Sequence, residues 1–141
     1  MRVCIDTNVL LQLFSNNPRW PELLEALTHG RVKWAVSTSI LLEDEEVTVR
    51  QSGPRRWQQV AGVIDALDYV LGSIRFVDPR FQFHAILADP DDNKFSDCAI
   101  AAQADFILTE DAHFDALRGS GHKPQPISPD DFIRQHLTQG N

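Results

Sequence analysis

The residues Met1-Arg2-Val3-Cys4-Ile5-Asp6-Thr7-Asn8 are the strongest indication of the fold. Its short apolar run predicts a buried strand over 2–6, and the residues that follow carry apolar side chains at helical spacing. The same pattern recurs at Phe106-Ile107-Leu108-Thr109-Glu110-Asp111, where a second apolar strand stops before a short helical pattern. If these two strands are parallel and adjacent, Asp6 and Asp111 meet at the edge of the sheet where α/β proteins bind ligands.

Strands and helices alternate along the rest of the chain. We expect strands at 2–6, 32–36, 74–77, 105–109 and near Ile127, and helices at 8–15, 20–29, 38–51, 55–71, 92–104, 111–118 and from Pro129. Strands separated by helices imply an α/β fold with a parallel sheet. The length of 141 residues suits one globular core, so we expect a single domain over 1–141.

Composition argues against several classes of protein. The apolar run of residues 3–5 is too short for a signal peptide, and no later run approaches the roughly 20 residues that a membrane span requires. Cys4 and Cys98 lie in apolar patterns typical of buried thiols, not of a disulfide or a zinc site. We therefore expect a cytoplasmic protein without membrane association.

A run of four consecutive acids lies within 37–49, where a solvated helix face is the ordinary explanation. Glu43 lies three residues after Ile40 and four before Val47, so it borders the apolar stripe that those residues define. Asp44 borders the same stripe on its other side. Spacing alone does not choose between the two acids, although a glutamate reaches farther from the helix axis.

Asp92 opens a helical pattern after Asp89-Pro90-Asp91, and helix capping alone would explain an aspartate there. Asp6 and Asp111 could also be helix caps. Three acids at three separate helix entrances, with a fourth inside a helix, favour a metal-ion site for phosphodiester cleavage instead. Carboxylate ligands without Cys or His partners favour Mg²⁺ or Mn²⁺ over zinc.

The segments 3–8, 37–43, 89–95 and 104–111 together resemble the PIN domain, the ribonuclease family that includes VapC-type toxins and PilT N-terminus-like proteins. The resemblance implies a three-layer α/β/α sandwich around a mainly parallel sheet of about five strands. It places the catalytic, metal-binding acids of the family on Asp6, Glu43, Asp92 and Asp111. The choice of Glu43 over Asp44 rests on this analogy.

Further positions are interpreted from the same resemblance. Asn8 and Thr109 are expected to orient the carboxylates, a role that metal sites commonly require. Asp97 lies five residues after Asp92, about 140° around a helix axis, so we expect a supporting residue and not a ligand. Glu110 stands where many relatives have Gly, and its charge would alter ion affinity or the approach of substrate.

The net charge of −7 argues against a basic nucleic-acid binder. Ions bound by the four acids would neutralise part of that charge. The cations expected to remain available for phosphates are Arg50, Arg55, Arg56 and Lys94. Weak or guided binding of nucleic acid is the expectation.

The resemblance implies an Mg²⁺- or Mn²⁺-dependent endoribonuclease that hydrolyses phosphodiester bonds of single-stranded or structured RNA, as toxins of toxin–antitoxin pairs do. Its implied partners are the RNA substrate, an antitoxin protein and a second copy of the chain. Apolar residues that could serve either the core or a homodimer recur at helical spacing, namely Trp57, Val60, Val63, Ile64 and Leu67.

Two alternatives belong to other functional classes. A catalytically inactive PIN-like module would bind RNA or protein, and the presence of all four acids argues against it. A phospho-accepting receiver domain would need an acidic pair at the first strand, where this chain has Asp6 alone.

Overall fold

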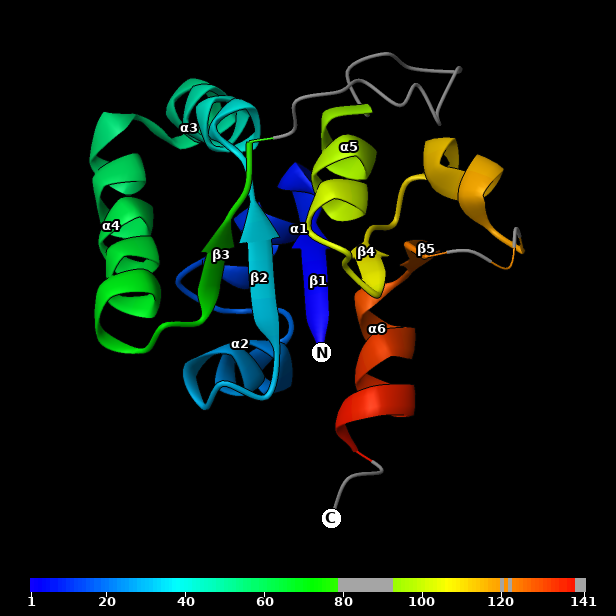
Figure 1. Cartoon of the computed structure of the whole chain (residues 1–141). Coiled ribbons are helices and arrows are strands. Elements are labelled where there is room, and N and C mark those ends of the chain that lie inside the picture. The colour runs from blue at the N-terminus through cyan, green and yellow to red at the C-terminus, as the bar shows by residue number, and fades with distance from the viewer. Residues whose placement is uncertain (79–92, 120, 122, 139–141) are drawn as a thin grey trace.

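Five parallel strands form the centre of the protein in the computed structural model, which describes residues 1–78, 93–119, 121 and 123–138 (Figure 1). Every neighbouring pair is parallel, and the order across the sheet is β3 (Ile74–Phe76), β2 (Lys33–Val36), β1 (Arg2–Ile5), β4 (Phe106–Leu108) and β5 (Gln125–Ile127). The chain builds outward from β1 in one direction and then from β4 in the other. The sheet therefore has its switch point between β1 and β4, where α/β folds form a crevice at the carboxyl ends of the strands.

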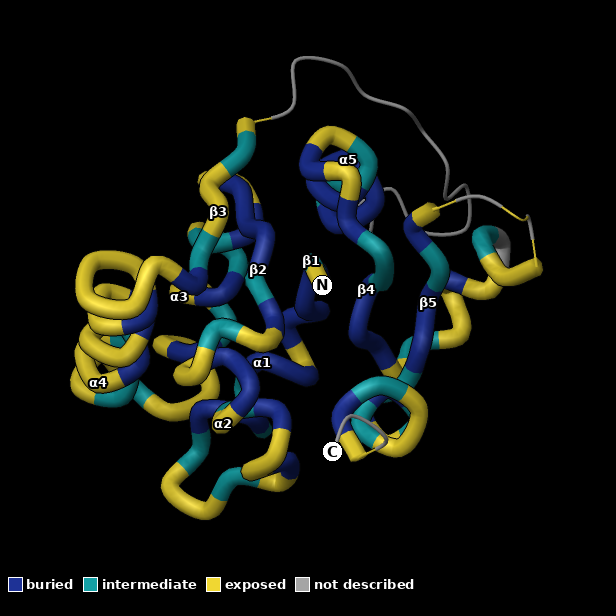
Figure 2. Tube along the Cα trace, turned by 60° about the horizontal axis from the view of Figure 1, so that its bottom comes forward, coloured by how far each residue is buried: buried dark blue, intermediate teal, exposed yellow. Residues whose placement is uncertain are grey.

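Helices cover both faces of this sheet and complete the expected three layers (Figures 1 and 2). Helix α5 (Asn93–Ala101) lies over one face, and α1 (Thr7–Leu13) and α2 (Pro21–Thr28) lie over the other. The remaining helices are α3 (Thr38–Ser52), α4 (Pro54–Asp65) and the short α6 (Pro129–Phe132). A π-helical turn extends α4 over Ala66–Val70 and another extends α6 over Ile133–Leu137, while a 3₁₀ helix spans Ala112–Leu117.

The core is centred on β1, whose residues Val3, Cys4 and Ile5 are buried (Figure 2). This burial follows from the position of β1 between two other strands and beneath helices on both faces. Cys4 and Cys98 are both buried with free thiols, as their apolar surroundings predict. A hydrogen bond with the neighbouring Cys98 thiol, together with burial, raises the pKa of Cys4 well above its ordinary value.

A sharp corner joins α3 to α4. The hydroxyl of Ser37 accepts a hydrogen bond from Ile40 N at 3.3 Å and so caps the start of α3. The helix ends at Gly53, whose φ of 91° lies in the region that side chains with a Cβ avoid, and Pro54 then occupies the first turn of α4. The cap at Ser37 starts α3, with its run of acids, directly after β2, and the corner at Gly53 turns the chain into α4.

The predicted strands and helices are observed with small changes at their ends, such as α1 ending at Leu13 instead of residue 15. Within the described residues, no helix is long and apolar enough to cross a membrane.

Candidate active site

The carboxyl ends of β1 and β4 bring Asp6 and Asp111 to the same edge of the sheet. Ile5 pairs with Leu108, and Asp6 N donates to the Leu108 carbonyl at 3.0 Å, so Asp6 and Thr109 are the first residues beyond two paired strands. The Thr109 hydroxyl donates to Asp6 Oδ2 at 2.9 Å and accepts from Asp111 N, also at 2.9 Å. Thr109 thus contacts the Asp6 carboxylate and holds the backbone of Asp111 beside it.

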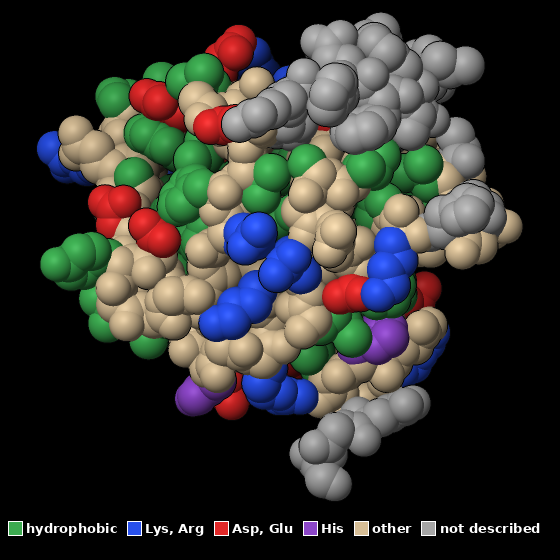
Figure 3. Space-filling model, viewed as in Figure 1, with side chains coloured by type: hydrophobic (Ala, Val, Ile, Leu, Met, Phe, Trp, Pro, Cys, Tyr) green, Lys and Arg blue, Asp and Glu red, His purple; other side chains and the backbone are tan. Residues whose placement is uncertain are grey.

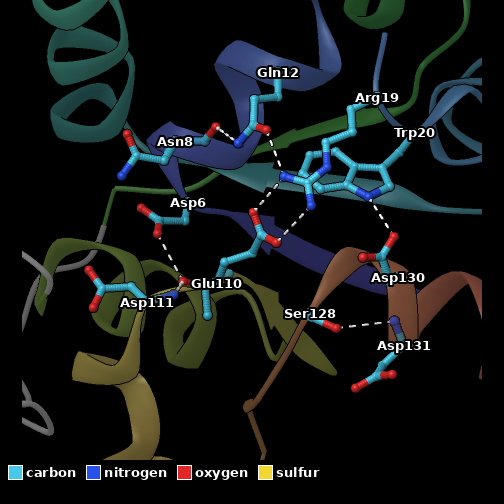
Figure 4. Close-up of polar contacts among 11 residues, drawn as sticks. Asp6, Asn8, Gln12, Arg19, Trp20, Glu110, Asp111, Ser128, Asp130 and Asp131 are labelled. Carbon is cyan, nitrogen blue, oxygen red and sulfur yellow. Dashed lines mark hydrogen bonds and ion pairs between the residues drawn. The ribbon is translucent and has the colours of Figure 1, made fainter.

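Asp111 also begins the 3₁₀ helix that follows β4. Its Oδ1 accepts a hydrogen bond from His113 N at 2.9 Å, and the Nδ1 atom of His113 lies 3.4 Å from the same oxygen. Asp111 therefore is a helix cap, while its carboxylate still points toward the same side as Asp6 (Figure 4). Capping and ligand binding are not exclusive roles, because a carboxylate has several lone pairs.

Thr7 connects this edge of the sheet to α3. Its hydroxyl lies 2.7 Å from Glu43 Oε2 and 2.8 Å from Asp44 Oδ1. A hydroxyl has one hydrogen to donate, so it satisfies both carboxyl groups only when one of them carries a proton. A protonated Asp44 can donate to Thr7, which then donates to Glu43. No sequence pattern distinguishes Thr7, because a threonine at a helix start is common.

Asp44 is the deeper of the two neighbouring acids. It is 0% exposed, whereas the Glu43 side chain is 26% exposed. The pKa of Asp44 is raised to about 7, mainly by burial and also by the charges of Glu43 and Asp6, while the hydrogen bond with Thr7 and the charge of Lys94 oppose the shift. The stripe of α3 that enters the core runs through Ile40, Asp44 and Thr48, so the expectation that Val47 defines it was wrong.

The cation beside Glu43 is Lys94, whose Nζ lies 2.6 Å from Glu43 Oε1. Lys94 is therefore not available for phosphates in the way that we expected. Arg50 pairs with Glu46 at 3.6 Å, and Arg56 donates to Asn16 Oδ1 at 3.1 Å and to Gln59 Oε1 at 2.9 Å. Both arginines lie on exposed contacts of this kind, so their availability to phosphates stays a prediction.

The remaining predicted residues are placed as follows. Asp92 lies outside the described residues. Asp97 is buried on α5. Asn8 is exposed on α1, and within the described part of the chain its side-chain amide has no hydrogen bond to a carboxylate, while its carbonyl accepts from Gln12 Nε2 at 3.0 Å.

Glu110 and Arg19 form an ion pair directly beside Asp111 (Figure 4). Two parallel contacts join them, from Nη1 to Oε1 at 3.1 Å and from Nη2 to Oε2 at 3.3 Å. The extra charge that distinguishes position 110 is therefore matched by an arginine. Arg19 was not predicted to lie here, since 91 residues separate it from Glu110.

The donor chemistry of this edge fits a hard divalent cation. Asp6, Glu43 and Asp111 offer carboxylate oxygens from three separate segments, and the Lys94 ammonium already supplies a positive charge beside one of them. Among the residues that the structure describes, no three His, Cys, Asp or Glu side chains are grouped closely enough to hold a metal ion. The predicted set of ligands includes Asp92, which lies outside the described residues.

Comparisons with known proteins identify the family. A family model described as a PIN domain matches residues 2–113. Among solved structures, a chain of VapBC2 from Rickettsia felis, crystallised bound to a DNA fragment from their promoter, is similar with a TM-score of 0.56 and 17% identity, over 82% of this chain and 92% of that chain. No curated protein matches the sequence.

An open parallel sheet with acids at the carboxyl ends of β1 and β4 is an arrangement expected of metal-assisted nucleases. The match over residues 2–113 shows that the chain belongs to the PIN-domain family. PIN domains are generally nucleases, and they typically use divalent metal ions.

Proposed function

We propose that this protein is an endoribonuclease that uses Mg²⁺ or Mn²⁺ to hydrolyse phosphodiester bonds of RNA. The observation that carries the proposal is the position of Asp6 and Asp111 at the switch point of the sheet, where the Thr109 hydroxyl donates to Asp6. Thr7, the residue after Asp6, contacts Glu43 on α3. Membership of a family of nucleases supports the reaction class.

Asp6, Glu43, Asp92 and Asp111 would hold the metal, with the assignment of Asp92 resting on the family resemblance. When bound, a divalent ion activates water as a nucleophile and stabilises the charge that develops on the phosphate and the leaving oxygen. Thr109 orients Asp6 for this role, and Thr7 orients Glu43. Lys94 balances the charge of Glu43 when no ion is present.

The single-stranded form of RNA is the proposed substrate. Phosphate contacts position a strand without reading its sequence, and unpaired segments can bend into a site at the edge of a sheet. Cleavage of a single strand should therefore exceed cleavage of a perfect duplex of the same sequence, and it should fall as salt rises. Equal rates on both substrates would contradict this part of the proposal.

A toxin role and an antitoxin partner are proposed from the likeness to a VapBC complex. On this proposal a second protein covers the edge of the sheet that carries Asp6 and Asp111 and so keeps the nuclease inactive. Co-expression with the product of the neighbouring gene, followed by assay of the purified pair, should show a stable complex with reduced cleavage.

The direct test is cleavage of a labelled single-stranded RNA with Mn²⁺ and with EDTA. Wild type should cut only with metal, and Asp6→Asn should not cut. The matched control is Asp115→Asn, because Asp115 is an exposed aspartate that pairs with Arg118 at 3.2 Å on the 3₁₀ helix and has no proposed role. Asp115→Asn should retain wild-type cleavage.

Metal binding should also stabilise the folded state of wild type and of Asp115→Asn but much less that of Asp6→Asn, since a ligand stabilises a fold only as far as it binds it. Thermal unfolding with and without Mn²⁺ measures this difference. If wild type binds RNA without cutting it, and its melting temperature does not change when Mn²⁺ is added, the inactive binding module becomes the correct interpretation.

A further inference from the structure

We propose that Arg19 binds a phosphate of the substrate RNA next to Asp6 and Asp111, at the carboxyl ends of β1 and β4. Until RNA binds, the Glu110 carboxylate holds the Arg19 guanidinium in an ion pair. This inference rests on the proposed function, because it concerns how RNA reaches the same site. It assigns a substrate-positioning role to a residue outside the predicted set.

The first argument is the way Arg19 is attached to the site. Its Nη1 donates to Gln12 Oε1 at 2.8 Å, and the Gln12 amide donates in turn to the Asn8 carbonyl at 3.0 Å. Both Gln12 and Asn8 belong to α1, the helix that begins directly after Asp6 (Figure 4). The guanidinium is therefore fixed to the same rigid element that carries the first acid.

The second argument is that the orientation of Arg19 has a support besides Glu110. The guanidinium carbon lies 4.6 Å from the centre of the Trp20 ring, which is a favourable cation–π contact. Trp20 is buried, and its Nε1 donates to Asp130 Oδ1 at 3.0 Å, so the ring is held in place. A side chain that is already ordered loses less entropy when it binds a ligand.

The third argument is the chemistry of the pair. The planar fork of an arginine fits a carboxylate and a phosphate equally well, so Glu110 occupies the place that two phosphate oxygens would take. The side chains of Arg19 and Glu110 are 48% and 39% exposed, and an exposed ion pair is weak enough for an incoming anion to replace it. Lys94, by contrast, is held by an acid that we assign to the metal site.

The fourth argument is the space beyond Arg19. The guanidinium borders a surface pocket of about 550 Å³ between α1, α3 and α4. Amide and hydroxyl groups line it, from Gln12, Asn16, Asn17, Gln51 and Ser52. A nucleotide whose phosphate lies on Arg19 therefore has room and polar partners on the side away from Asp111.

The test measures binding of a labelled single-stranded RNA by fluorescence anisotropy in EDTA, where no cleavage is expected, over a series of salt concentrations. Glu110→Gln should bind about 3- to 10-fold more tightly than wild type, because Arg19 no longer has a charged competitor. Arg19→Ala should bind about 5- to 10-fold more weakly. It should also lower the slope of log affinity against log salt by about 0.7, the value for one phosphate contact on a single strand.

The double variant separates this exchange from a simple change of net charge. In the Arg19→Ala background, Glu110→Gln should improve binding by less than about 2-fold, because residues that act through each other are not additive. Arg134→Ala is the matched control, since Arg134 is an exposed arginine that pairs with Asp131 at 2.7 Å on the C-terminal helix. It should leave the affinity near that of wild type. In cleavage with Mn²⁺, Arg19→Ala should raise KM and change kcat by less than about 3-fold.

If wild type binds and cuts RNA while Glu110→Gln binds no more tightly, the inference is wrong and the proposed function stands. The same holds if Arg19→Ala keeps the wild-type affinity and salt slope. Glu110→Gln leaves the Trp20 contact intact, so its result decides the matter even if Arg19→Ala folds poorly. If wild type neither binds nor cuts RNA, the inference and the proposed function both fall.

Discussion

Glu43 and Asp44 show how strongly a neighbouring position on one helix changes the chemistry of a carboxyl group. Glu43 is partly exposed and pairs with Lys94. Asp44 is buried, forms a hydrogen bond with Thr7, and lies near the charges of Glu43 and Asp6. Burial penalises a charged carboxylate, so the proton stays on Asp44 to a much higher pH than on an ordinary aspartate. The two acids share one threonine hydroxyl, and only Asp44 is fully buried.

This difference predicts that the metal-free protein loses stability as the pH rises from about 4 to 7. The pKa of Asp44 is raised to about 7 in the folded state from 3.8, so folding favours the protonated form. That contribution is fully present below the unfolded pKa and is lost as the pH passes the folded one. Asp44→Asn imitates the protonated acid and should therefore be more stable than wild type at pH 8, by on the order of 1 to 4 kcal/mol.

Urea unfolding in EDTA at pH 5 and pH 8 checks this prediction. The advantage of Asp44→Asn should be small at pH 5, where wild-type Asp44 is itself protonated. Glu46→Asn is a suitable comparison, since Glu46 is an exposed acid on the same helix. An Asp44→Asn protein that is equally destabilised at both pH values would show that the carboxyl group is needed in its charged form.

A second prediction concerns Asp92 and Asp91, which both lie outside the described residues. The family resemblance assigns the ligand role to Asp92 and none to Asp91. Asp92→Asn should abolish cleavage and most of the stabilisation by Mn²⁺, while Asp91→Asn should keep both. Cleavage assays and thermal unfolding of the two variants decide which aspartate is the metal ligand. The reverse result would assign the ligand role to Asp91.

Local patterns predicted the acids at strand ends but not their polar surroundings. Asp6 and Asp111 could be placed together because a strand that ends on an acid is visible in a short stretch of sequence. The burial of Asp44 could not be predicted, because an acid on a core-facing stripe is ordinarily unfavourable and the partner that accommodates it, Thr7, lies 37 residues away. No local sequence pattern predicts the pairing of Arg19 with Glu110.

At the scale of elements, the turn after β4 is set by a single side chain. Thr109 connects the end of β4 to the end of β1 through Asp6 and also binds the backbone of Asp111. The strands themselves were predictable from their apolar runs, as was the corner at Gly53 and Pro54. The capping by Asp111 and the threonine bridge depend on the pairing of β1 with β4, which the spacing of apolar residues only suggests.

We therefore predict that Thr109→Val folds but loses activity. Valine keeps the shape and removes both hydrogen bonds, which should lower the free energy of unfolding by about 1 to 3 kcal/mol. Cleavage should fall by about 10- to 100-fold, as is common when a residue that orients a metal ligand is removed. Thr109→Ser keeps the hydroxyl and should recover most of the activity in the same assay, and its failure to do so would indicate a packing role for the methyl group.

At the scale of the whole molecule, apolar side chains that the core does not use gather on the side of α3 and α4 (Figure 3). Val60 and Ile64 of α4 and Leu67 of its π-helical extension are buried, so they belong to the core. Leu42 is 61% exposed and Phe76 is 53% exposed, and both line an apolar pocket of about 280 Å³ between α3, α4 and β3. Large apolar groups that remain exposed together favour an interface.

The predicted homodimer would use this surface. Light scattering after size exclusion at high micromolar concentration should give twice the chain mass of 15.9 kDa. Leu42→Glu with Phe76→Glu should give a folded monomer, because charges would be buried without partners in the interface. A wild-type protein that is monomeric at this concentration would contradict the prediction of a homodimer.

The central place of β1 in the sheet affects how early in synthesis the candidate active site can form. The hydrogen bond between Asp6 and Thr109 joins residues 103 positions apart. A ribosome adds about 5 to 20 residues per second, so roughly 5 to 20 s separate the appearance of these two residues. Until β4 is made, Asp6 lacks both its neighbouring strand and the acid at the next strand end. On the proposed function, the growing chain therefore cannot cut the messenger RNA that encodes it before most of it has been translated.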